Sequence, residues 1–178
     1  MLIRIYILGM LAKQDNYPYM LRKQLLEVQP FTALSEGKFY YDFEALNKNK
    51  FIEPVETIHE QKRPDKTIYS ITKSGREYLQ EELYSCFKKN AEIEDLYIAI
   101  YFLDFINIKK AAMIFEETIE REKRLWEKHE EKKDLLLTTE SISITSQLIT
   151  EHAFNKAHFN IEWMERLLVF IKNYKGQE

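Results

Sequence analysis

The stretch from residue 35 to residue 75 constrains the fold more than any other part of the sequence. Ser35 is a good N-cap and predicts a helix over about 36–48. Phe39, Phe43 and Leu46 fall on one face of this helix and should be core, and Lys38, Tyr41, Asp42 and Ala45 fall on another. Two segments rich in β-branched and aromatic residues follow at 51–56 and 67–72, and the polar segment between them indicates a hairpin. Thr72 is then placed to cap a further helix that runs toward residue 89. The stretch therefore predicts a helix, two strands and a second helix.

Two shorter helices are expected before this stretch, at 2–13 and about 17–28, from the i, i+4 and i+7 spacing of their apolar residues. Gly9 lies in the middle of the first helix, where it costs about 1 kcal/mol relative to Ala. We expect that close packing against a neighbouring element explains this glycine. Three helices followed by a hairpin are the order of a winged helix-turn-helix, in which one helix enters a DNA groove and the hairpin flanks it.

The second half of the chain is predicted to be helical, with helices at about 92–105, 108–137 and 144–174. The first of these is apolar nearly all round and should be largely buried. Each of the two longer helices would be about 45 Å long, and one small domain cannot cover their apolar stripes. We therefore expect a homodimer in which the two chains bury these stripes against each other. The predicted fold class is mainly α with a small β-hairpin wing: a winged helix-turn-helix domain at 1–88 and a long-helix dimerisation domain at 89–178.

The charge distribution supports the same division more than the net charge does. The chain carries a net charge of −3, which does not suggest a nucleic-acid binder. Residues 1–79, however, hold 12 Lys and Arg against 10 Asp and Glu, whereas residues 80–178 hold 14 against 19. This asymmetry favours DNA as the partner of the N-terminal half and solvent or protein as the partner of the C-terminal half.

The N-terminal segments resemble the PadR-like transcriptional regulators. The family motifs of the first three helices have counterparts at Ile7–Leu11, Pro18–Leu21 and Gly37–Phe43. The motif of the first strand corresponds to Lys50–Ile52, and that of the strand-to-helix junction corresponds to Tyr69–Gly75. The resemblance covers residues 2–80. The C-terminal half is similar to the longer helical arm of the virulence-activator-like branch, through His152 and the stretch Glu162–Met164.

The sequence departs from the family pattern at three positions. Pro18 and Lys50 each stand where the pattern has Gly, and Lys38 replaces a small hydroxyl residue. The turn at Lys50 is expected to need a positive φ, which Lys adopts reluctantly, and Asn49 is the alternative residue for that conformation. Lys38 would add a donor to a phosphate or a base edge.

The resemblance implies which side chains face DNA. Side chains around the second and third helices would contact the duplex, and a basic cluster at the wing tip would reach the flanking groove or phosphates: Tyr19, Ser35, Lys38, Tyr40, Tyr41, Lys62, Arg63 and Lys66. Three alternatives remain open: Tyr40 is a core aromatic, Tyr41 is a partly exposed packing residue, and the basic cluster is a solvated loop. A dimer would read two half-sites about one helical turn apart.

Many members of this family repress transcription and release DNA when a small aromatic molecule binds, so the resemblance also implies an effector pocket. Its candidate residues are Tyr97, Tyr101, Trp126 and Trp163, with plain core packing as the alternative. No cofactor is expected. The four His show no ligand spacing, Cys86 stands alone, and the sequence has no glycine-rich phosphate loop, so we expect neither a metal site nor an enzyme.

These observations together predict a cytoplasmic, homodimeric transcriptional regulator that binds double-stranded DNA. The apolar residues 1–12 include Arg4 and lack a cleavage site, no stretch is long enough to span a membrane, and a single Cys fits a reducing compartment. We expect a repressor that occupies its promoter competitively and is switched when the helical arm changes the spacing of the two winged helices. Activation through the same residues stays open. The alternative function is a winged-helix module that binds protein rather than specific DNA.

Overall fold

The computed structural model describes residues 2–27, 36–59, 65–89, 92–138 and 143–176, and it describes the helix but not the side chains at 131–138. The chain divides into two compact units. Unit 1 comprises Met1–Ser85 and Tyr97–Ile106, and unit 2 comprises Cys86–Leu96 and Asn107–Glu178. The boundary expected after residue 88 stays a prediction.

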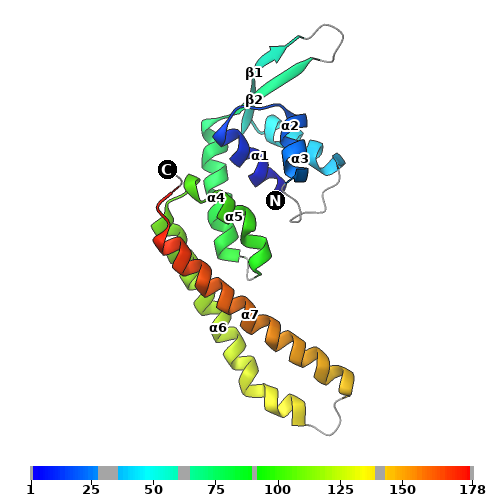
Figure 1. Cartoon of the computed structure of the whole chain (residues 1–178), viewed down its shortest axis with the longest axis vertical. Coiled ribbons are helices and arrows are strands. Elements are labelled where there is room, and N and C mark those ends of the chain that lie inside the picture. Colours follow the sequence, from blue (N-terminus) through cyan, green and yellow to red (C-terminus); the bar gives the residue numbers. More distant parts are fainter. Residues whose placement is uncertain (1, 28–35, 60–64, 90–91, 139–142, 177–178) are drawn as a thin grey trace. The chain divides into compact units, whose positions relative to one another are not determined.

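Unit 1 contains the helices and strands expected from the sequence. Helices α1 (Leu2–Lys13), α2 (Pro18–Glu27) and α3 (Glu36–Lys48) precede strands β1 (Ile52–Ile58) and β2 (Lys66–Ile71), and α4 (Lys73–Lys89) begins directly after β2 (Figure 1). The core is formed by apolar side chains from all three N-terminal helices and both strands: Ile5, Ile7, Leu8, Leu21, Phe39, Phe43, Leu46, Ile52 and Ile71.

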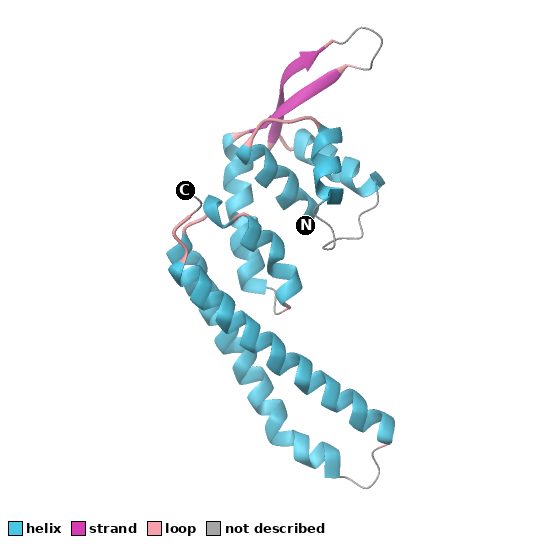
Figure 2. Ribbon diagram, viewed as in Figure 1, coloured by secondary structure: helices cyan, strands magenta, loops and turns pink. Residues whose placement is uncertain are grey.

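The hairpin is antiparallel and projects from the helices of unit 1 (Figure 2). Ile52 pairs with Ile71 at its base and Ile58 with Lys66 toward its tip, and the register shifts between Pro54 and Glu56. A bulge of this kind bends the strand and increases its twist. The segment before α2 joins the sheet, because the backbone of Asn16 exchanges two hydrogen bonds with Tyr69, at 3.1 and 2.9 Å.

Gly9 packs against an aromatic ring, as the sequence analysis expected. A Cβ at this position would lie 2.5 Å from the ring of Phe102, which is closer than any side chain tolerates. Phe102 is fully buried and comes from the segment Tyr97–Ile106, far along the chain from α1. The glycine therefore allows a segment from the second half of the sequence to complete the core of unit 1.

We predict that Gly9→Ala destabilises the protein although Ala favours helices. The added methyl group would overlap the buried Phe102 ring, and overpacking of this kind costs about 1–3 kcal/mol. Urea unfolding followed by circular dichroism measures the effect. Gly37→Ala is the matched control, because a Cβ there meets nothing within 4 Å. Equal stability of the two variants would contradict the packing role of Gly9.

The expectation of one helix over about 92–105 is wrong. The segment is a 3-10 turn at Ile93–Leu96, a short helix α5 at Tyr97–Tyr101 and a second 3-10 turn at Leu103–Phe105. It also changes unit, since the residues up to Leu96 pack in unit 2 and those from Tyr97 pack in unit 1. Four apolar residues are buried, in keeping with the expectation, whereas Tyr97 and Tyr101 are exposed. A straight helix cannot distribute one apolar stripe between two separate cores, so the helix is interrupted.

Unit 2 is built on two long helices, α6 (Ile108–Thr138) and α7 (Ile144–Asn173), as expected (Figure 1). The two helices pack along each other within one chain, which the sequence analysis did not predict. Ser143 caps α7 by accepting a hydrogen bond from the backbone N–H of Ser146 at 3.1 Å. These two helices and the last turns of α4 bury a set of apolar side chains in unit 2: Phe87, Phe115, Ile119, Phe154, Met164, Leu168 and Ile171.

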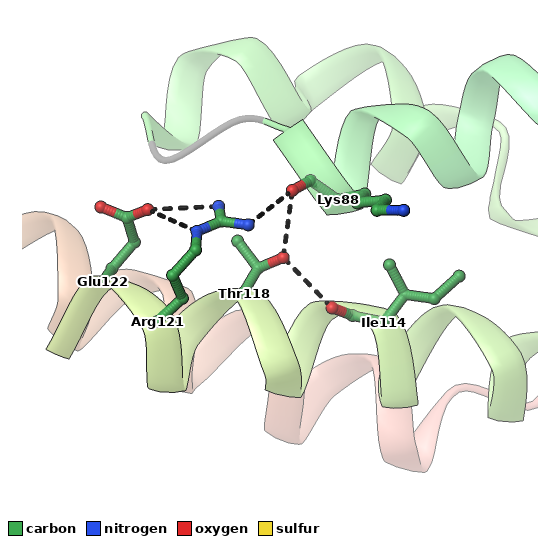
Figure 3. Close-up of polar contacts among 5 residues, drawn as sticks. All are labelled: Lys88, Ile114, Thr118, Arg121 and Glu122. Atoms are coloured by element: carbon green, nitrogen blue, oxygen red, sulfur yellow. Dashed lines mark hydrogen bonds and ion pairs between the residues drawn. The ribbon is translucent and has the colours of Figure 1, made fainter. Parts of the chain in front are cut away.

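The last turn of α4 belongs to unit 2 and is held there by α6 (Figure 3). The carbonyl oxygen of Lys88 accepts hydrogen bonds from the Thr118 hydroxyl at 3.3 Å and from the Arg121 guanidinium at 3.2 Å. Arg121 is in turn paired with Glu122. The final carbonyls of a helix have no partners within the helix, and a cation near them is favourable. Thr118 and Arg121 therefore act as a side-chain cap for α4.

Candidate nucleic-acid interface

Helix α3 separates a buried apolar face from an exposed polar face. Phe39, Phe43 and Leu46 are each 1% exposed, as expected for core residues. Lys38 is exposed and the ring of Tyr41 is 70% exposed, so both side chains are presented outward from the same helix. An exposed cation and an exposed aromatic hydroxyl on one helix face are donors suited to a phosphate backbone or a base edge.

Helical spacing places Asp42 on the same face as Lys38 and Tyr41, but its side chain is buried. Asp42 is 2% exposed, and its Oδ1 atom accepts a hydrogen bond from Nε of Arg4 at 2.7 Å. Hydrogen bonding to Asp42 raises the pKa of Arg4, with a smaller contribution from the Tyr78 hydroxyl. The signal in the sequence was Arg4 in the first turn of α1, where it is surrounded by apolar residues, because such a cation needs a carboxylate partner close by.

The turn between α3 and β1 has the expected positive φ, but at Lys50 itself, where φ is 58°. The alternative that Asn49 takes this role is wrong, since Lys50 is the one non-glycine residue with positive φ among those described. The amide of Asn49 instead donates to the carbonyl of Ala45 at 2.7 Å. Left-handed backbone at a lysine is strained, so contacts around the turn must stabilise it.

Those contacts come from the junction of β2 with α4. The Thr72 hydroxyl donates to the carbonyl of Lys50 at 2.8 Å and accepts the N–H of Gly75 at 3.0 Å, which confirms Thr72 as the cap of α4. The Ser74 hydroxyl also donates to Lys50, at 3.2 Å. A Cβ at Gly75 would overlap the carbonyl oxygen of Phe51, so glycine is required there. The end of α3 and the base of the wing are therefore joined directly.

The remaining predicted DNA contacts lie on several elements. Tyr19 is exposed on α2, and Tyr40 is half-buried with its ring edge-on to Phe39 at 5.5 Å. The amine of Lys66 lies 5.9 Å above the ring of Tyr17. Ser35, Lys62 and Arg63 lie outside the described residues. The structure thus brings Lys38, Tyr40 and Tyr41 together on α3, and their contacts with DNA stay predictions.

The candidate effector residues divide between the units. Tyr97 and Tyr101 belong to unit 1, where the amine of Lys13 lies 4.3 Å above the ring of Tyr101. In unit 2, Trp126 packs edge-on against Phe154 at 5.5 Å, and the guanidinium of Arg166 lies 5.1 Å from the ring of Trp163. Their role as effector contacts stays a prediction.

No group of three or more His, Cys, Asp and Glu residues that could hold a metal ion occurs in the described ranges. Likewise, none of the helices in the described part of the chain combines the length and the apolar character needed to cross a membrane.

The three helices, the hairpin and the outward face of α3 define a winged helix-turn-helix protein. Residues 7–81 match the family model described as "Transcriptional regulator PadR-like family", which is a family of regulators rather than enzymes. The matched residues run from α1 through the hairpin into α4. No match was found among curated proteins.

Several solved structures of PadR-family proteins are similar to the chain. A regulator from Clostridium difficile R20291 is 29% identical with a TM-score of 0.38, over 43% of this chain and 78% of that one. Bacillus subtilis PadR in complex with operator DNA is 19% identical with a TM-score of 0.44, over 96% and 99%. The same protein in complex with p-coumaric acid is 19% identical with a TM-score of 0.40, over 97% and 100%. Because TM-scores below 0.5 do not establish a common overall fold, the assignment rests on the family match.

We predict that Lys50→Gly stabilises the protein. Glycine relieves about 1–2 kcal/mol of left-handed backbone strain in the folded state. Its greater conformational freedom in the unfolded chain reduces this gain in stability by about 0.5–1 kcal/mol. The backbone carbonyl of residue 50, which accepts a hydrogen bond from the Thr72 hydroxyl, is retained in the variant. The midpoint of urea unfolding should rise by an amount equivalent to up to about 1.5 kcal/mol.

The matched control for Lys50→Gly is Lys48→Gly, which removes a similar exposed lysine from the last turn of α3. Its backbone is helical, so this change should destabilise by up to about 1 kcal/mol. If both variants lose stability, strain at Lys50 is not significant.

Proposed function

We propose that this chain is a cytoplasmic transcriptional repressor that binds, as a homodimer, an operator with two half-sites. The observation that carries the proposal is the exposed face of α3, with Lys38 and Tyr41, in a domain that matches a family of transcriptional regulators. The repressor would occupy its promoter competitively. An activator would use the same residues on DNA.

The arrangement of carboxylates supports DNA over a protein partner. Acidic side chains near the proposed face would neutralise it, and two of these are turned elsewhere. Asp42 is buried against Arg4, and Asp65 pairs with His59 at 2.9 Å. Asp42 therefore does not present its carboxylate at the exposed face of α3. The side chains of Glu36 and Glu60 lie outside the described residues.

We predict that Lys62/Arg63/Lys66→Ala weakens binding to the operator and reduces its dependence on salt. Each phosphate contact contributes about 0.9 to the slope of log K against log[salt], so loss of three contacts reduces it by up to about 2.7. Fluorescence anisotropy measures binding to a fragment upstream of the protein's own gene, with unrelated DNA as the competitor.

The matched control is Lys109/Arg124/Lys128→Ala, which removes the same charges from exposed positions on α6. Equal losses in the two triple variants would indicate a general charge effect instead of a wing contact. If the wild-type protein selects no sequence from a random DNA library, the protein-interaction alternative replaces the proposal.

A second apolar face on α7 supports the homodimer. One face packs against α6 through Phe154, Met164 and Ile171. At a period of 3.6 residues, the opposite face carries large exposed side chains in heptad-like spacing: Leu148, Phe159, Trp163 and Phe170, which are 66, 61, 42 and 50% exposed. A long exposed apolar stripe is typical of a protein–protein interface. We propose that a second copy of the chain covers it.

We predict that Phe159→Glu/Phe170→Glu produces monomers, because each buried carboxylate would lose its hydration without gaining a partner. Sedimentation equilibrium measures the molecular mass. The control is Met113→Glu/Leu125→Glu, which places the same charges at exposed apolar positions of α6 and should leave the dimer intact. A monomeric wild type, or a dimer insensitive to the α7 changes, would refute this interface.

We further propose that a small aromatic acid releases the protein from DNA, with Tyr97, Tyr101, Trp126 and Trp163 as candidate contacts. Bacillus subtilis PadR has been solved with p-coumaric acid, which makes this compound the natural first probe. The anisotropy titration is repeated with p-coumaric acid and related acids added. An operator affinity that none of them changes would remove the effector from the proposal.

A further inference from the structure

The contact between α1 and α3 contains a polar interaction within an otherwise apolar core. The side chain of Asp42 is 4% exposed and that of Arg4 is 32% exposed, and their Nε–Oδ1 distance is 2.7 Å. The other carboxylate oxygen, Oδ2 of Asp42, is buried and has no hydrogen-bond partner among the described residues. The pair therefore includes a buried acceptor that is only half satisfied.

Stability alone does not account for such a pair. A buried ion pair must offset the desolvation of both charges, and apolar residues of similar volume are frequently as stable or more stable. The unpaired Oδ2 atom adds a further cost. The charged pair differs from an apolar contact in its direction, because a hydrogen bond of 2.7 Å fixes both a distance and an angle.

The Arg4–Asp42 pair lies next to the residues of α3 that are proposed to contact DNA, so it can affect the direction in which they point. Lys38 is one helical turn before Asp42 on α3, and Tyr41 is its immediate neighbour. On the other side, Arg4 is close to the Tyr78 hydroxyl, and the ring of Tyr78 stacks on Phe51 at 4.5 Å with an angle of 4° between the planes. Arg4 thus joins α1 to the middle of α3, beside the Tyr78 side chain of α4.

We propose that Arg4 and Asp42 are a positioning pair that fixes the rotation of α3 about its axis, and that sequence-selective DNA binding depends on it. The inference rests on the proposed DNA-binding function. Side chains extend about 5–6 Å from a helix axis, so a rotation of about 20° moves their ends by about 2 Å. A binding site tolerates errors of only about 0.5 Å. The apolar contacts of Phe39 and Phe43 fix this angle less sharply than a short charged hydrogen bond does.

The test replaces the pair by an apolar pair, Arg4→Met/Asp42→Leu, in the full-length protein. We expect thermal stability close to that of the wild type, since no unpaired charge remains. Selectivity, measured as the ratio of affinities for selected and unrelated DNA, should fall at least tenfold. Affinity for unrelated DNA and its salt slope should not change, because the phosphate-binding residues are intact.

Two further measurements separate positioning from folding. Amide hydrogen exchange should show faster exchange in α3 of the double variant while α1 retains its protection. Arg4→Lys keeps the cation but not the planar guanidinium that fixes the angle, and it should lose part of the selectivity. It also serves as the informative variant if the apolar pair fails to fold.

The control Lys172→Met/Glu116→Leu removes an ion pair of 2.8 Å from unit 2 and should leave selectivity unchanged. Unchanged selectivity and α3 exchange in the apolar pair variant, or wild-type selectivity in Arg4→Lys, would overturn the inference and leave the proposed function standing. A wild-type protein that selects no DNA at all would overturn the proposed function and with it this role of the pair.

Discussion

The packing of Phe102 against Gly9 is the contact on which the organisation of the chain depends. A side chain at position 9 would occupy the space of the ring, so only glycine allows α1 and the segment Tyr97–Ile106 to approach so closely. This approach carries residues from the second half of the sequence into the core of unit 1. The compact unit that contains the winged helix is consequently discontinuous in sequence, and the interruption of the predicted fifth helix follows from it.

Within unit 1 the candidate DNA-binding elements are held by directional contacts as well as by apolar packing. Thr72 and Ser74 stabilise the strained turn at Lys50, which joins the end of α3 to the wing. Arg4 contacts α3 through Asp42. Hydrogen bonds define angles that a hydrophobic contact leaves free. A protein that recognises bases needs its recognition helix held at a fixed angle, because a helix rotated by a fraction of a turn presents different atoms to the groove.

Much of the fold was predictable because local patterns are strong in this chain. Helix periodicity located α1, α3, α6 and α7, and β-branched residues around a polar turn indicated the hairpin. Prediction succeeded at Phe39 and Phe43, whose spacing alone marks a buried face. It failed at Asp42, because helical spacing does not reveal that a cation on another helix lies within hydrogen-bonding distance. The candidate DNA-contact residues were derived from a family resemblance, and their contacts await experiment.

The sequence by itself determined the order of the elements, the cap at Thr72, the need for positive φ near Lys50 and the family of the N-terminal domain. These properties depend on residues close together in the chain, where backbone geometry and periodicity act. Only the tertiary structure decided that Phe102 fills the space beside Gly9, that Asp42 is buried against Arg4, and that Thr118 and Arg121 cap α4. Each of these joins residues at least 30 positions apart. Such contacts depend on how whole elements pack, which no local pattern specifies.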